Sequence, residues 1–472
     1  MRAFVGVLLV TMVLMSACGA GDDGASPADA AAIDAAAVDA VPLDGAPADA
    51  EPLPEVTAPM LALGFSFSCL LHPTGRVKCW GDNSSGQLGL GDTAARGDAP
   101  GELGGALPWI DLGTGRHAIA IAGGLNHVCA ILDDHRLKCW GSNGHGELGL
   151  GDTAARGDQP GEMGDALPAV DLGAGRTALA VAAGEFSTCA LLDDHSVKCW
   201  GANDQGQLGQ GDTVQRGDDP GELGDALAPV DVGSLHVADL GVGYYFACVT
   251  SDEGDVRCWG SNSEGQLGQG TTQRRGDDPG EMGAALVATT FGAGRFVARL
   301  GVGRFHSCAI LDGDGALKCF GAGTSGQLGQ GDLQSRGDQP GEMGDALPVV
   351  DLGVGRTARG LAFTQSDVCA LLDDDEVKCW GNDFYGQAGQ GHRSRIGDGP
   401  GEMGDALQPV PLPVGRAVRQ VAGGGEHMCA LFEDGGVRCW GFNDRGQLGQ
   451  GDTETRGDDP GEVAATADVA LY

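Results

Sequence analysis

Beyond about residue 58 the chain alternates short apolar runs with polar, glycine-rich stretches. In one such stretch the apolar runs cover residues 178–182, 188–192, 197–201 and 228–232. Each run has the length of a β-strand, and the polar segment 193–195 between the second and third has the size of a hairpin turn. The runs are apolar on both faces, as in sheets stacked between other sheets. We predict four short strands here.

The same stretch recurs along the chain, as the cysteines show. After Cys18 the cysteines fall into seven pairs whose first members are about 60 residues apart: 69 and 79, 129 and 139, 189 and 199, 248 and 258, 308 and 319, 369 and 379, 429 and 439. Seven four-stranded antiparallel sheets arranged radially form a propeller that leaves only short, protected sheet edges. We therefore predict an all-β, seven-bladed β-propeller.

The third strand of each copy and the loop after it carry a family resemblance. The segments CWGDNSSGQLGLGD, CWGANDQGQLGQGD, CWGSNSEGQLGQG and CWGFNDRGQLGQGD resemble the repeats of the regulator of chromosome condensation (RCC1), and the resemblance covers residues 59–472. It implies the same seven-bladed propeller. His127, His306 and His427 match a histidine of the family pattern. The other four copies have Phe67, Ser187, Phe246 and Asp367 in place of this histidine. Elsewhere in the pattern, Glu147 replaces Gln in copy two, Phe320 replaces Trp in copy five and Ala388 replaces Leu in copy six.

One bulky aromatic residue follows the second cysteine in every copy. Aromatic side chains bury about 150 to 250 Å² each, enough to fill the space between neighbouring sheets. We interpret these residues as the core between blades: Trp80, Trp140, Trp200, Trp259, Phe320, Trp380 and Trp440.

The paired cysteines are expected to form disulfide bonds. A hairpin closed at Asp194 places Cys189 opposite Cys199, at a separation that a disulfide can span. The fifth copy has one more residue in its turn and still keeps both cysteines. A zinc site would need closer ligand spacing, and a nucleophilic cysteine would occur in one special copy. We predict seven disulfides: Cys69–Cys79, Cys129–Cys139, Cys189–Cys199, Cys248–Cys258, Cys308–Cys319, Cys369–Cys379 and Cys429–Cys439.

The N-terminal residues indicate export. Arg2 precedes an apolar run of signal-peptide length, and Ser16-Ala17-Cys18 resembles a bacterial lipobox, which implies cleavage before Cys18 and lipidation of its thiol. An alternative is a plain secretory signal. Residues 1–17 are thus predicted to be a lipoprotein signal peptide, 18–58 an Ala/Asp/Pro-rich flexible linker and 59–472 the propeller. The expected location is the bacterial cell envelope, at the outer membrane or cell surface.

Charge narrows the range of partners. The chain has 66 acidic and 29 basic residues, and residues 61–472 alone carry 57 and 28. Such a surface repels phosphate backbones, so nucleic acid is not an expected partner. At 42% hydrophobic residues, general disorder is also excluded.

The loops between the third and fourth strands repeat the pattern GDTxxRGDxPGEMGDALP, with acids such as Asp92, Asp98 and Glu102. Calcium binding is one interpretation of these carboxylates, but the ligand order of an EF-hand is absent. Arg-Gly-Asp occurs six times and resembles an integrin motif, although repetition at one structural position favours an architectural role. We find no catalytic constellation and predict neither an enzyme, a cofactor nor a metal site.

These features favour a monomeric, non-enzymatic scaffold that binds a protein or envelope ligand and meets the membrane only through the lipid on Cys18. A calcium-dependent adhesin or glycan binder is an alternative, based on the acidic loops. The family resemblance implies two more: an inhibitor, like a secreted relative that inhibits β-lactamase, and a guanine-nucleotide exchange factor. An exported chain would not meet a cytosolic GTPase, which argues against the last.

Overall fold

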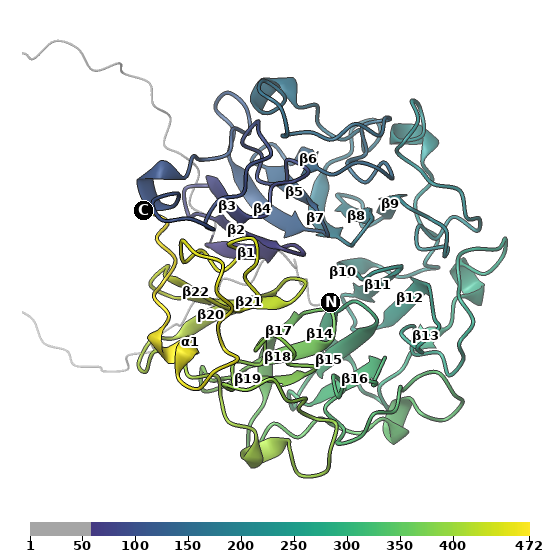
Figure 1. Cartoon of the computed structure of the whole chain (residues 1–472). Coiled ribbons are helices and arrows are strands. Elements are labelled where there is room, and N and C mark those ends of the chain that lie inside the picture. The colour runs from purple at the N-terminus through teal and green to yellow at the C-terminus, as the bar shows by residue number, and fades with distance from the viewer. Residues whose placement is uncertain (1–57) are drawn as a thin grey trace, which may run out of the picture.

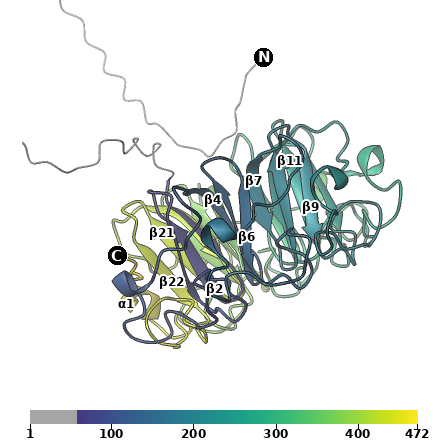
Figure 2. The ribbon, with the colours of Figure 1, turned by 90° about the horizontal axis from the view of Figure 1, so that it is seen from above.

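The computed structural model describes residues 58–472, which form a closed ring of seven antiparallel sheets around a central axis (Figure 1). Seen at right angles, the strands cross the thickness of the ring (Figure 2). This confirms the predicted all-β, seven-bladed propeller. The blades are numbered one to seven along the chain and contain β1–β3 (Met60–Leu63, Phe67–Leu71, Val77–Gly81), β4–β6 (Ala118–Gly123, His127–Leu132, Leu137–Gly141), β7–β9 (Ala178–Ala183, Ser187–Leu192, Val197–Gly201), β10–β13 (Val237–Val242, Phe246–Ser251, Val256–Gly260, Ala288–Thr289), β14–β16 (Val297–Val302, His306–Leu311, Leu317–Gly321), β17–β19 (Ala358–Phe363, Asp367–Leu372, Val377–Gly381) and β20–β22 (Val418–Gly423, His427–Phe432, Val437–Gly441).

The first strand of each blade lies at the axis. β1 contacts β4 and β20, and each later first strand contacts the first strands on either side. These strands are rich in alanine and glycine, as in AIAIAG of β4 and ALAVAA of β7. Small side chains let seven strands meet around one axis. The second and third strands are buried almost throughout and pack against the neighbouring blades.

The predicted fourth strand is present in blade four alone among the described blades, so the prediction of four-stranded blades was wrong for the other six. In blade three the segment 228–232 is joined to β9 by a bond from Val230 N to Val197 O, and blades one, two, five, six and seven have an equivalent bond. Proline has no N–H to donate to a ladder. It occurs in this segment in five blades, as Pro108, Pro168, Pro229, Pro348 and Pro409. Blade four has Val287 there instead, and β13 pairs with β12.

The two sides of the ring carry different connections. One side has the three-residue turns between the first and second strands, and we name it the turn face: 64–66, 124–126, 184–186, 243–245, 303–305, 364–366 and 424–426. The other side has the hairpins between the second and third strands, such as 72–76 and 193–196, and we name it the hairpin face. Met60 pairs with Leu71, so the chain enters blade one at the hairpin face.

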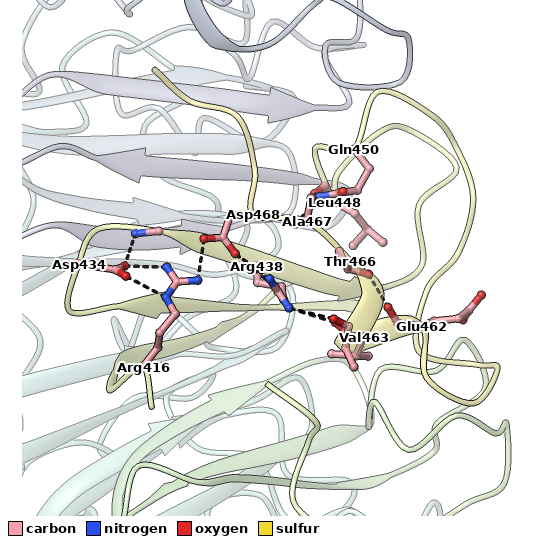
Figure 3. Close-up of polar contacts among 12 residues, drawn as sticks. Arg416, Asp434, Arg438, Leu448, Gln450, Glu462, Val463, Thr466, Ala467 and Asp468 are labelled. Atoms are coloured by element: carbon pink, nitrogen blue, oxygen red, sulfur yellow. Dashed lines mark hydrogen bonds and ion pairs between the residues drawn. The ribbon is translucent and has the colours of Figure 1, made fainter. Parts of the chain in front are cut away.

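The ring closes between blades seven and one. The Gln420 side chain pairs with the Leu61 backbone, accepting from its N–H at 2.9 Å and donating to its carbonyl at 3.0 Å. Lys78 Nζ donates to the Leu471 carbonyl at 2.6 Å. In the last blade Asp468 accepts from Arg416 and Arg438 (Figure 3). Side chains from both ends of the ring therefore close it.

The helical content is slight. Six 3₁₀ turns lie in the loops that precede the fourth segment, at Gly104–Ala106, Gly164–Ala166, Gly224–Ala226, Gly283–Ala285, Gly344–Ala346 and Gly404–Ala406. A single helical turn, α1 (Glu462–Ala465), takes their place in blade seven. Within residues 58–472 we find no helix with the length and apolarity needed to cross a membrane.

Candidate functional site

A cavity opens on the turn face at the propeller axis. It has a volume of about 520 Å³, including space open to solvent, and every blade contributes three residues to its wall: 63–65, 123–125, 183–185, 242–244, 302–304, 363–365 and 423–425. The last residue of each set lies in a turn and differs from blade to blade. We name these seven the axial residues: Phe65, Leu125, Glu185, Tyr244, Arg304, Gln365 and Gly425.

Backbone hydrogen bonds link the axial residues of adjacent blades. Phe65 N donates to Leu125 O, and the backbone N–H groups of Leu125, Tyr244, Gln365 and Gly425 donate in the same direction to the next blade. Within the described ring, the backbone N–H groups of Glu185 and Arg304 make no equivalent bond to blades four and six. The ring of backbone bonds therefore has two gaps.

The Arg304 side chain spans both gaps. Its Nε lies 2.7 Å from Glu185 Oε1 in blade three, and its Nη1 donates to Gln365 Oε1 in blade six. The guanidinium carbon lies 4.6 Å from the centre of the Tyr244 ring, a cation–π contact. Burial raises the pKa of the Glu185 carboxyl to about 7, although Arg304 opposes that rise.

Aromatic side chains surround this ion pair on the turn face. Tyr244 lies against Tyr245, Phe186 and Phe305, with ring centres 3.7, 6.1 and 5.3 Å away. A second group, Phe384, Tyr385 and Phe442, lies on blades six and seven, with ring centres 4.9 and 4.4 Å apart. Three of the four tyrosines of the chain thus lie in turn-face loops. Other copies hold polar residues at several of these positions, such as Glu185 in place of Tyr244 and Ser66 or Asn126 in place of Tyr245, so the rings are not a requirement of the fold.

Buried carboxyls lie beside the cavity in blades six and seven. Asp367 is completely buried, and loss of water raises its pKa to about 6. Glu426 follows the axial residue Gly425, and its Oε2 accepts from Gln387 Nε2 at 2.6 Å. Burial, together with the Asp367 charge, raises the pKa of Glu426 to about 8.

Blade six also places a carboxyl where five other blades have an asparagine, while blade five has Gly323. Asn83 Nδ2 donates to the Asp92 carbonyl at 2.8 Å, and Asp383 occupies the equivalent position in blade six. Its Oδ1 accepts from Ala388 N, while its Oδ2 lies 3.2 Å from His392 Nδ1. Burial, reinforced by nearby Asp367 and Asp458, raises the pKa of Asp383 to about 8.

On the hairpin face, arginines pair with aspartates of their own blade in five of the seven blades. Arg176 lies 3.2 Å from Asp193 and 3.1 Å from Asp194 of its own hairpin. The same pattern joins an arginine to hairpin aspartates in blades two, five, six and seven, through Arg116, Arg295, Arg356 and Arg416.

The predicted cysteine pairs are bonded in the structure. All seven disulfides join directly opposed residues of the second and third strands, with Cα atoms 4.0–4.1 Å apart. The six tryptophans predicted for the core between blades, together with Phe320, are buried. Each tryptophan also donates its indole N–H to the preceding blade, as from Trp200 to the Glu147 carbonyl at 3.0 Å. Cys18, the signal peptide and nearly all of the linker lie outside the described residues.

Two of the three matching histidines reach a hydroxyl of the next blade. His127 Nε2 lies 2.9 Å from Thr188 Oγ1, and His427 Nε2 lies 2.9 Å from Ser68 Oγ. Thr188 donates its own proton to the Glu147 carbonyl, so it accepts from His127. For His306 the equivalent residue in the next blade is Val368, which has no hydroxyl. Neither ring nitrogen of His306 makes a hydrogen bond to a described residue. Burial lowers the pKa of His306 to about 4.

The Arg-Gly-Asp segments are part of the architecture. Arg96 pairs with Asp92 of its own loop at 2.6 Å, and Gly97 is buried with a φ of 95°. Glu102 accepts from Gly97 N and Ala99 N. Asp92 and Glu102 of this loop are therefore engaged with arginine and backbone. Among residues 58–472 no three His, Cys, Asp or Glu side chains are grouped to hold a metal ion.

Sequence reasoning missed a buried lysine between blades. Lys138 Nζ donates to Leu112 O of the preceding blade at 3.0 Å and to Gly164 O of its own blade at 2.8 Å. Burial lowers the pKa of Lys138. The sequence feature that could have revealed these buried cations is the basic residue that precedes the second cysteine in every copy: Lys78, Lys138, Lys198, Arg257, Lys318, Lys378 and Arg438.

A closed ring of seven disulfide-bonded blades with a variable axial cavity defines a repeat β-propeller of the binding-scaffold type. Five segments match the model "Regulator of chromosome condensation (RCC1) repeat", at residues 61–87, 118–147, 179–207, 237–266 and 418–447. Blades five and six lie outside these matched segments, and their second and third strands pair in the same way.

Relatives with RCC1-type sequences are found among curated proteins. The Ultraviolet-B receptor UVR8 of Arabidopsis thaliana is 27% identical over 412 residues, covering 85% of this chain and 82% of UVR8. The human E3 ubiquitin-protein ligase HERC2 is 28% identical over 385 residues, which span 80% of this chain and only 7% of HERC2.

Solved structures share the fold. Human WBSCR16 has a TM-score of 0.60 at 20% identity, covering 83% of this chain and 92% of that one. Prp20p of Saccharomyces cerevisiae, whose structure was described with its binding properties to Gsp1p and histones, has a TM-score of 0.59 at 18% identity and covers 88% and 87%. At these identities the likeness shows the fold alone.

Proposed function

We propose that the protein is a cell-envelope lipoprotein whose propeller binds a partner protein through the turn face. The observation that carries this proposal is the concentration of Tyr, Phe and Arg side chains around the axis, at positions the fold leaves free to vary. Aromatic residues and arginine are enriched at the centres of protein interfaces. The hairpin face has an aromatic group at blade one, made of His72, Trp109 and Tyr472 with Arg76, but in five blades its arginines pair with hairpin aspartates of the same blade.

The predicted export agrees with the cysteine chemistry. Structural disulfides persist in oxidising compartments and are rare where thiols are kept reduced. Cys18 is the proposed lipid attachment site, and 40 residues separate it from Ala58, the first described residue. A Cys18→Ser variant is expected in the soluble fraction, whereas the wild-type protein is expected in the membrane fraction.

The point of entry favours the turn face as the available surface. Since the chain reaches blade one at the hairpin face, a tether from Cys18 would attach on that side. The axial residues then open on the opposite side of the ring, away from the attachment.

Photo-crosslinking in intact cells tests which face binds. A crosslinking amino acid is placed at Tyr244 or Phe65 on the turn face, and at Arg176 on the hairpin face as the matched control. We expect a discrete partner band from the turn-face positions, lost on Phe305→Ala. Equal crosslinking from both faces, or none from the turn face, would contradict the proposal.

A further inference from the structure

Two glutamates lie at the axial cavity, and one of them has no paired cation. Among the lining residues in the described ring, Arg304 is the one cation, and it is already paired with Glu185. Glu426 lies next to the lining residue Gly425 and close enough for Arg304 to lower its pKa, but its hydrogen-bond partner is the neutral amide of Gln387. With no cation paired to it, burial favours the protonated form of Glu426. A second cation at the cavity would favour the carboxylate instead.

The existing contacts of Arg304 show which chemical group the cavity walls accept. The guanidinium lies over Tyr244 and, at 5.3 Å, over Phe305, while its nitrogens meet carboxylate and amide oxygens. Phe65 is partly exposed, and its ring lies against Gly425, next to Glu426. The Phe65 ring thus lines the cavity at Gly425, and the Glu426 carboxyl belongs to the next residue of the same turn. Cations bind to such walls by cation–π and charge-assisted contacts.

The size of the cavity limits the ligand. The part of the cavity that a water-sized sphere can reach is about 120 Å³, which accommodates the end of one side chain rather than a folded element. The partner would therefore insert one long residue while its remaining surface meets the aromatic loops.

We propose that the axial cavity takes a lysine or arginine side chain from a basic segment of the partner protein, held by Glu426, Glu185 and the rings of Phe65 and Tyr244. This inference rests on the proposed function, since it specifies the partner that the turn face binds. The charge of the propeller agrees: residues 61–472 carry 57 acidic and 28 basic side chains. Complementary charge gives such interfaces their specificity and association rate.

Binding of a hexa-arginine peptide to the full propeller, measured by calorimetry at physiological salt, tests the inference. Hexa-citrulline is the neutral control of the same shape. We expect Glu426→Gln and Glu185→Gln each to weaken hexa-arginine binding about tenfold or more, as for loss of a buried charge partner. Glu253→Gln on the hairpin face removes the same charge from an exposed site and should leave binding unchanged.

Proton release gives a second readout. Burial holds the pKa of Glu426 near 8, so a cation bound beside it at pH 7 should ionise the carboxyl and release a proton. Calorimetry in buffers of different ionisation enthalpy measures this release, which Glu426→Gln should abolish. Attraction to carboxylates already ionised at the surface would release no proton. Absence of release, or equal weakening by Glu253→Gln, would overturn the inference.

The two proposals can fail separately. If crosslinking from Tyr244 persists in the Glu185→Gln and Glu426→Gln variants, the turn face binds a partner without an inserted cation. If crosslinking from the turn face is absent, the proposed function itself fails. Glutamine keeps the acceptor oxygen for Gln387, and melting temperatures of both variants report whether they fold.

Discussion

At the residue scale, the seven copies act as controls for one another. A position that makes a hydrogen bond in one blade and not in another shows what the fold requires and what it merely tolerates. His306 and Asp383 are two residues whose counterparts in other blades have partners that they lack.

Val368→Thr should stabilise the protein. Thr188 is the equivalent residue in blade three, where its hydroxyl accepts from His127 and donates to a carbonyl. A threonine at 368 would give buried His306 a partner, worth about 1 kcal/mol in the free energy of unfolding. The reverse change, Thr188→Val, leaves His127 unpaired and should cost about 1 to 3 kcal/mol. Thermal unfolding of both variants measures the two effects, and a loss of stability in Val368→Thr would contradict this account.

Asp383→Asn should also stabilise the protein, in a pH-dependent way. An amide at 383 can donate to the His392 carbonyl, as Asn83 does to Asp92. The folded-state pKa of Asp383, about 8, lies above that of an unfolded aspartate, so the folded wild type binds more protons between about pH 4 and 8 and loses stability as pH rises through that window.

The stability gained by Asp383→Asn should therefore grow from pH 5 to pH 8, by at most about 1.4 kcal/mol per pH unit. Melting temperatures of wild type and variant across this range measure the difference. A gain that is constant with pH would show that Asp383 does not titrate in the window.

At the element scale, the sequence located the strands well where pairing is regular. The runs 178–182, 188–192 and 197–201 correspond to β7, β8 and β9 within one residue. The fourth predicted strand, 228–232, is not a strand in blade three. Pro229 has no N–H to donate, and the Val230 N–H makes the backbone bond to β9. Apolar character reports burial, and this segment is buried without forming a ladder.

The candidate site was less accessible to sequence reasoning. The turns before the second strand visibly vary between copies, but only ring closure shows that they meet at one axis. Glu185 and Arg304 lie 119 residues apart, in blades that are not neighbours. No local pattern predicts such a pair. The buried lysines between blades were visible as a basic residue inside an apolar strand, a signal that indicates a satisfied ammonium group.

At the scale of the whole molecule, the disulfides reinforce blades from within. Each links two strands of one hairpin, and all fourteen paired cysteines are at most 1% exposed. Contacts between blades rest instead on tryptophan, leucine, lysine and glycine-rich loops. Stability of the hairpins and closure of the ring are therefore carried by different residues.

The native protein should resist reduction. Because the sulfurs are buried, a mild reductant at neutral pH is expected to leave all seven disulfides intact until the ring unfolds. Alkylation followed by mass spectrometry measures the free thiols of residues 58–472 with and without denaturant. The double variant Cys189→Ala, Cys199→Ala should lose about 2 to 3 kcal/mol of stability. Rapid labelling of native cysteines would show that the hairpins open without global unfolding.

The ring of axial residues has a practical consequence. Five of the seven use their backbone N–H to bind the next blade. At Phe65, Leu125, Tyr244 and Gln365 any amino acid except proline has that N–H, whereas a Cβ at Gly425 would lie 2.6 Å from the Phe65 carbonyl oxygen. A library that keeps Gly425 and randomises the other six codons would alter the centre of the turn face while leaving the disulfides and the tryptophans untouched. Such a collection offers a route to new affinity reagents on a covalently reinforced framework.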